Sequence, residues 1–93
     1  MRITVTQEDI DDGRPQDAFR CPIALATKRD TAILSGNAAV SVTHHDLCLH
    51  RNGGRTLWRA LMPPDATAFT DDFDAGHSVM PFSFEAHFMD LRR

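Results

Sequence analysis

Apolar and polar residues alternate in three separate stretches of the chain, which is the pattern of β-strands with one buried face. In 2–6 the apolar positions are Ile3 and Val5, and 38–43 alternates in the same way. The stretch 80–88 is the longest, with its phenylalanines on one side and its charged and hydroxyl side chains on the other. We expect a strand in each stretch, followed after residue 88 by a frayed tail over 89–93.

A β-hairpin is predicted between residues 46 and 61, because Asn52-Gly53 is a favoured two-residue turn. With this dipeptide at the centre of the turn, Leu47 lies opposite Trp58 and Asp46 lies opposite Arg59. One face, which we expect to be buried, then holds Leu47, Leu49, Thr56, Trp58 and Ala60. The other face, which we expect to be partly wet, holds Asp46, Cys48, His50, Arg55, Leu57 and Arg59.

A short helix over 7–12 is predicted by its capping signals. Thr6 stands three residues before Asp9, which is a weak form of the capping box. Gly13 is placed to end this helix. Residues 30–37 are expected to form a connection, with Ser35-Gly36-Asn37 as a turn signal.

Two longer helices are predicted further along the chain. Pro22 suits the first position of a helix over 21–29, which continues with good helix-forming residues. Asp65 is placed to cap a helix that runs to residue 75, where Gly76 provides a stop.

The order of these elements is typical of an α+β fold. We expect a mainly antiparallel sheet of about five strands, with two to three short helices packed on one face. The chain, 1–93, is treated as a single domain. The residues expected to form its core are Ile3, Val5, Leu25, Val40, Val42, Leu47, Leu49, Trp58, Phe69, Phe73, Phe82, Phe84 and Phe88.

Composition narrows the functional classes. Of the 93 residues, 42% are hydrophobic and 25% are charged, and the net charge is −3. These values exclude wholesale disorder and a strong general attraction to nucleic acid or anionic membrane. No stretch approaches the roughly 20 apolar residues that span a bilayer, and no signal peptide is visible. We therefore expect a cytoplasmic protein in which Cys21 and Cys48 are reduced.

Motifs for catalysis and metal binding are weak. His44, His45, Cys48 and His50 lie close together, but zinc sites need three or four convergent ligands, normally at recognisable spacing. Cys21 precedes a helix whose N-terminus could lower the thiol pKa, although it also fits a plain helix start. We expect no catalytic residues, metal, cofactor or enzyme activity. A metal or redox role for Cys48 with His50, or for Cys21, is left open.

Arg51, Arg55 and Arg59 concentrate positive charge on the predicted hairpin. They are the candidate residues for nucleic-acid binding, which also needs an aromatic side chain on which bases stack. The predicted register turns Trp58 away from Arg55 and Arg59, so the two requirements are not met on one face. The alternative is a solvated strand face in which Asp46 pairs with Arg59.

Asp71, Asp72 and Asp74 lie in the second half of the last predicted helix, where the helix dipole disfavours negative charge. Residues 60–90 contain no lysine or arginine. Either hairpin arginines neutralise these acids in the fold, or the acids form a recognition surface for a basic partner. They and the carboxylates of 8–12 are expected to face solvent.

Three segments resemble a family of small uncharacterised proteins of bacteriophages and prophages. They are Ile3-Thr4-Val5-Thr6-Gln7-Glu8-Asp9-Ile10, Cys21-Pro22-Ile23-Ala24-Leu25-Ala26, and Phe73-Asp74-Ala75-Gly76 with Pro81-Phe82-Ser83-Phe84-Glu85. Many relatives carry a second cysteine three positions before the Cys-Pro, where this chain has Ala18, so no thiol-pair role is implied here. The resemblance implies a phage setting in a bacterial host cell and no mechanism.

From this setting we expect a protein-binding module that modulates host machinery, such as a stoichiometric anti-defence or anti-CRISPR-like inhibitor. Its partner would be a host or phage protein with a basic surface. Nucleic-acid binding through the hairpin is the alternative function. Pairing of two copies across the strand at 80–88 would give a homodimer.

Overall fold

The computed structural model describes residues 1–36, 38–51 and 54–92, and it has the predicted α+β class. Its antiparallel strands form two sheets rather than one. A two-stranded sheet pairs β1 (Arg2–Val5) with β5 (Phe82–Glu85). A four-stranded sheet has the order β2 (Ala39–Val42), β3 (Asp46–His50), β4 (Thr56–Leu61) and β6 (Met89–Asp90).

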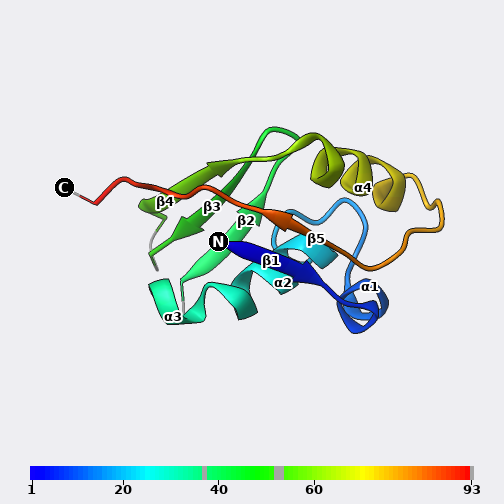
Figure 1. Ribbon diagram of the computed structural model, residues 1–93, viewed down its shortest axis with the longest axis horizontal. Coiled ribbons are helices and arrows are strands. Elements are labelled where there is room, and N and C mark those ends of the chain that lie inside the picture. Colours follow the sequence, from blue (N-terminus) through cyan, green and yellow to red (C-terminus); the bar gives the residue numbers. More distant parts are fainter. Residues whose placement is uncertain (37, 52–53, 93) are drawn as a thin grey trace.

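Four helices complete the described fold (Figure 1). They are α1 (Gln7–Asp12), α2 (Pro22–Asp30), α3 (Ala32–Ser35) and α4 (Pro64–Asp74). Helix α2 packs against strands of both sheets, so the helices do not all lie on one face of a single sheet as expected. Helix α3 lies in the segment predicted as a connection.

Helix α1 has the predicted capping box. The Thr6 hydroxyl accepts the Asp9 N–H, and the Asp9 carboxylate accepts the Thr6 N–H. Asp9 is buried, contrary to the expected solvent exposure, because both its oxygens accept hydrogen bonds from Arg29 of α2. Gly13 ends α1, where a Cβ would lie 2.6 Å from the Cδ atom of Pro22. The end of α1 therefore approaches α2 closely.

The hairpin register differs from the prediction. The Arg51 N–H donates to the Arg55 carbonyl at 2.9 Å, so Arg51 does not face Gly54 as expected. Leu57 then has no partner of its own, since His50 faces Thr56 and Leu49 faces Trp58. The proposed turn centre, Asn52-Gly53, lies outside the described residues. The prediction that Leu47 faces Trp58 is wrong.

The consequence for the two faces depends on the size of the shift, because neighbouring side chains point to opposite sides. From Trp58 onward the register has moved by two residues, so Trp58 and Ala60 stay buried as predicted. At Thr56 the register has moved by one residue, so Thr56 lies on the partly wet face instead of the predicted buried face. There its hydroxyl contacts the His50 ring. Leu57 is buried, contrary to the prediction.

The C-terminal region departs furthest from the prediction. The predicted strand 80–88 forms a regular strand only over β5, and Ala86 continues the pairing through two backbone hydrogen bonds with Met1. The tail is not frayed, because β6 pairs with β4. The Arg92 guanidinium lies 4.2 Å from the centre of the Trp58 ring. Position 93 lies outside the described residues.

The core agrees well with the prediction. Nine of the thirteen predicted residues are buried, and the others, Leu25, Phe73, Phe82 and Phe88, are partly buried. The alternation across β5 is as expected, with Phe84 inside and Ser83 and Glu85 outside. Ile23 of α2 is also buried, although it was not among the predicted core residues.

Candidate functional site

The C-terminal end of α4 is oriented by its phenylalanines. The Phe69 ring stacks on Phe82 of β5 with centroids 4.8 Å apart, and Phe73 stacks on Phe69. With this side of the helix turned inward, the side chains of Asp71 and Asp72 are each 57% exposed. Asp74 lies further round the helix and is half-buried. The predicted acidic surface is therefore divided, with two carboxylates facing solvent and one facing the protein.

The last turn of α4 concentrates negative charge. Gly76 adopts a φ of +82°, as expected for a residue that ends a helix, and its N–H donates to the Phe73 carbonyl. The turn contains no basic residue. Asp71 faces the His44 ring at 3.1 Å and Asp72 faces the His77 ring at 3.4 Å, both at exposed positions. These contacts are with histidines, and not with hairpin arginines as one of our alternatives required.

Asp74 joins two parts of the chain that are 58 residues apart. Its Oδ1 atom accepts the backbone N–H of Gln16 at 2.8 Å. Gln16 has a φ of +58°, and among the described residues it is the one non-glycine with a positive φ. Asp74 therefore holds the loop over residues 14–20 against α4.

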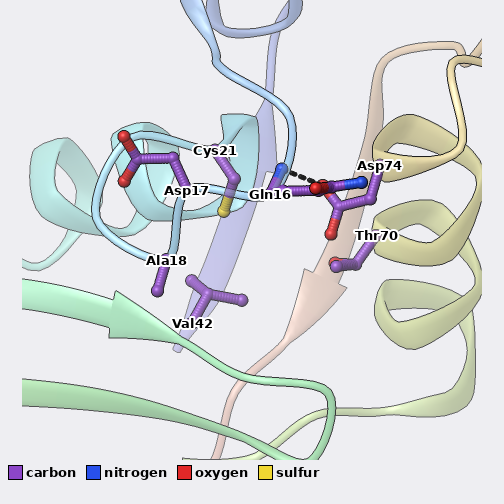
Figure 2. Close-up of a pocket in the computed structure, with 7 residues that line it drawn as sticks. All are labelled: Gln16, Asp17, Ala18, Cys21, Val42, Thr70 and Asp74. Atoms are coloured by element: carbon purple, nitrogen blue, oxygen red, sulfur yellow. Dashed lines mark hydrogen bonds between the residues drawn. The ribbon is translucent and has the colours of Figure 1, made fainter.

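A cavity of about 180 Å³ lies between this loop and α4 (Figure 2). Thr70 and Asp74, one turn apart on α4, form its polar wall. The Thr70 hydroxyl is buried and has no hydrogen-bond partner in the described chain. Cys21, Val42 and Ala18 line the cavity on the other side, so it has one polar and one mainly apolar wall.

Cys21 is the N-cap residue of α2 and is 5% exposed. Burial raises the pKa of its thiol above the ordinary value, and the charge of Asp74 raises it further, against the lowering effect of the backbone N–H groups of Ala24 and Ile23. The N–H groups at the helix N-terminus do lower this pKa, as considered from the sequence, but burial outweighs them and the net shift of the thiol pKa is upward. At neutral pH the thiol is protonated and is a poor nucleophile.

The hairpin arginines do not assemble with an aromatic surface. Arg59 donates to the Asp46 carboxylate at 2.6 Å, as predicted for a solvated strand face. Trp58 is 5% exposed and is covered by Arg92. Arg51 and Arg55 are exposed at the end of the hairpin.

The histidines and cysteines near the hairpin are engaged separately. The His50 ring lies between the hydroxyls of Ser41, at 2.6 Å, and Thr56, at 3.2 Å. Burial raises the pKa of the Cys48 thiol, and the nearby Asp46 carboxylate adds to this. Within 1–36, 38–51 and 54–92, no three histidine, cysteine or acidic side chains are placed to hold a metal ion.

No protein-family model, curated protein or solved structure matches this chain. The described part of the chain has no helix that is both long and apolar enough to cross a membrane.

Three residues that line the cavity, Gln16, Asp17 and Thr70, were not identified from the sequence. Thr70 precedes Asp74 by four positions, so the shared helix face was visible in the sequence. Gln16 lies in a loop without any pattern, and nothing in the sequence indicated that its N–H would meet Asp74.

Proposed function

We propose that this protein is a small protein-binding module that recognises a basic partner through the exposed carboxylates of Asp71 and Asp72. One observation carries the proposal: both side chains are 57% exposed at the negative end of α4, in a turn without a basic residue. Negative charge at the C-terminal end of a helix lowers the stability of that helix. Recognition of a basic partner therefore explains these two carboxylates better than a stabilising role does. Asp74, which lines the neighbouring cavity, also contributes to binding the partner.

The resemblance to small bacteriophage and prophage proteins supports a specific setting for this module. In that setting it acts stoichiometrically on host machinery in the bacterial cytoplasm, as anti-defence or anti-CRISPR-like inhibitors do. The expected lack of enzymatic activity stays a prediction. The protonated, buried thiol of Cys21 supports it, because thiol catalysis needs an accessible thiolate.

Nucleic-acid binding through Arg51, Arg55 and Arg59 is less well supported. Its stacking residue, Trp58, is buried, and Arg59 is held by Asp46. This surface therefore offers nucleic acid positive charge but no aromatic side chain on which bases can stack.

Affinity capture from a bacterial lysate, with and without nuclease, identifies the partner. Purified partner is then titrated against the wild-type protein, Asp71→Asn/Asp72→Asn, and a control, Asp11→Asn/Asp12→Asn. The control removes the same charge from the last turn of another helix, α1. We expect the first variant alone to bind more weakly, mainly through a slower on-rate, with a difference that shrinks as salt rises.

Equal affinities of the two variants at low salt would contradict the proposal. Capture that disappears after nuclease treatment would favour the nucleic-acid alternative.

We also propose that two copies associate across β5. In the described sheet β5 pairs with β1 on one side only, so its other edge is available to a second chain. The outer edge of β1 is blunted, because the N–H and carbonyl of Thr4 bond to Asp30 and Arg29. A dimeric mass by light scattering would support this association, and a monomeric mass at high micromolar concentration would refute it.

A further inference from the structure

We propose that the cavity between α4 and the 14–20 loop receives the guanidinium group of an arginine side chain from the partner. This inference rests on the proposed function, since it names one group by which a basic partner would be recognised. It differs from that function in its site: Asp71 and Asp72 attract the partner from the surface, whereas Thr70 and Asp74 would bind one side chain inside the cavity.

The two unlike walls of the cavity suit a cation with a polar edge and apolar faces. Its volume of about 180 Å³ is well above the roughly 10–15 Å³ that a cavity must offer to hold one water. Figure 2 shows Thr70 and Asp74 along one wall, with Ala18 and Val42 lying apart from them. A guanidinium group donates hydrogen bonds from its edge and packs its weakly hydrated faces on apolar groups, so it can satisfy both walls at once.

The polar wall has unused acceptors. The Thr70 hydroxyl is buried without a partner, which is uncommon for a polar atom in a folded protein. Asp74 uses Oδ1 to accept the Gln16 N–H, and a carboxylate has about four acceptor positions. The forked donors of arginine fit two neighbouring acceptors better than the single ammonium of lysine does.

The charge around the cavity favours a cation over other ligands. None of its lining residues is basic. The carboxylates of Asp71 and Asp72 lie on the same helix end, and the α4 dipole adds a partial negative charge there. The other acidic lining residue, Asp17, turns its carboxylate onto the N–H groups of its own loop, so Asp74 provides the charge inside.

The probe for this site is N-acetyl-arginine amide, titrated into ¹⁵N-labelled protein and followed by NMR. Its neutral analogue N-acetyl-citrulline amide has nearly the same shape and serves as the matched control. N-acetyl-lysine amide tests the choice of arginine. We expect saturable shifts of the Gln16, Cys21, Thr70 and Asp74 amides with the arginine probe, at the millimolar affinity of a single side chain, and weaker binding of the other two.

Two cavity variants test the assigned contacts. Asp74→Asn keeps an oxygen that can accept the Gln16 N–H but removes the charge, and it should weaken arginine binding roughly tenfold or more. Thr70→Val keeps the β-branched shape and should weaken binding several-fold. The surface variant Asp71→Asn/Asp72→Asn should change the affinity for this small probe less than Asp74→Asn does, because its carboxylates lie outside the cavity.

The proposal is overturned if the citrulline probe binds as well as the arginine probe. It is equally overturned if no saturable shift occurs at these four amides, in which case water alone fills the cavity. Failure here is distinct from failure of the proposed function. A partner that loses affinity for Asp71→Asn/Asp72→Asn but not for Asp74→Asn or Thr70→Val would uphold surface recognition and exclude the cavity.

Discussion

Helices α1 and α4 both carry acidic residues at each end, but the acids with contrasting contacts lie at opposite ends, Asp9 in the first turn of α1 and Asp71 and Asp72 near the last turn of α4. In α1, Glu8 and Asp9 lie in the first turn, where the helix dipole favours them, and Asp9 is bonded to both Thr6 and Arg29. In α4, Asp71 and Asp72 lie near the last turn without a basic neighbour in it. The comparison teaches that Asp9 stabilises the fold, whereas the exposed acids of α4 are available for another purpose.

The largest effect is expected from Asp9→Ala. This change leaves the Thr6 N–H without its cap and removes the carboxylate that accepts from Arg29 Nη1, so the free energy of unfolding should fall by roughly 2–4 kcal/mol. Urea denaturation measures it. The control Asp12→Ala, at an exposed position of the same helix, should stay within about 0.5 kcal/mol of wild type. Equal effects of the two changes would remove the structural role assigned to Asp9.

The glycines that follow the two helices should also differ. In Gly13→Ala the new Cβ would meet the Pro22 ring at 2.6 Å and the Asp9 carbonyl at 2.9 Å, so we expect a loss of about 1–3 kcal/mol from displaced packing. In Gly76→Ala the Cβ meets nothing within 4 Å, and only the φ of +82° opposes it, at a cost of about 1 kcal/mol. Thermal unfolding of both variants measures the two losses of stability. A larger loss of stability for Gly76→Ala than for Gly13→Ala would show that α1 does not approach α2 closely.

The stability of the protein should depend on pH through Asp46, which forms an ion pair with Arg59 as Asp9 does with Arg29. The hydrogen bond from Arg59 holds the pKa of Asp46 below its ordinary value. A lowered folded-state pKa contributes stability above the unfolded pKa, about 3.9, and that contribution is lost as pH falls through the folded pKa. Asp46→Asn should therefore be less stable than wild type at neutral pH, and the difference should shrink below about pH 4. A constant difference in urea denaturation across this range would contradict the assigned pair.

The smallest effect is expected from Asp71→Asn/Asp72→Asn. Removing negative charge near the C-terminal end of α4 should leave stability unchanged, or raise it by about 0.3–1 kcal/mol per residue at low salt, because the dipole penalty disappears. The histidine contacts are exposed and offset little of this. Urea denaturation at low and high salt measures the change. A clear loss of stability would show that His44 and His77 make these acids structural.

Much of the local structure could be predicted because its causes lie within a few residues. The Thr6 capping box, the Pro22 helix start and the Gly76 stop all act over one helical turn. The hairpin was harder, because one extra residue at the connection and one at Leu57 changed the partners of Leu47 and Trp58. Neither change has a signature as clear as a favoured turn dipeptide.

The candidate site could be predicted only in part. Asp71 and Asp72 were found from an unfavourable charge pattern on one helix, and their exposure agrees with it. Asp74 was grouped with them because helical spacing does not show what packs against its flank. Cys21 was considered for its place at a helix start, but its burial, which governs its pKa, depends on the surrounding fold.

The sequence by itself determined the α+β class, the main helices, the alternation of strand faces and most of the core. These features follow from backbone propensity and from the 3.6- and 2-residue periods of side-chain direction. Only the tertiary structure decided that the strands divide into two sheets, that the tail pairs with β4, and that Gln16 meets Asp74 across 58 residues to form a cavity. Such contacts depend on how the whole chain excludes water, and no local pattern encodes which distant surfaces meet.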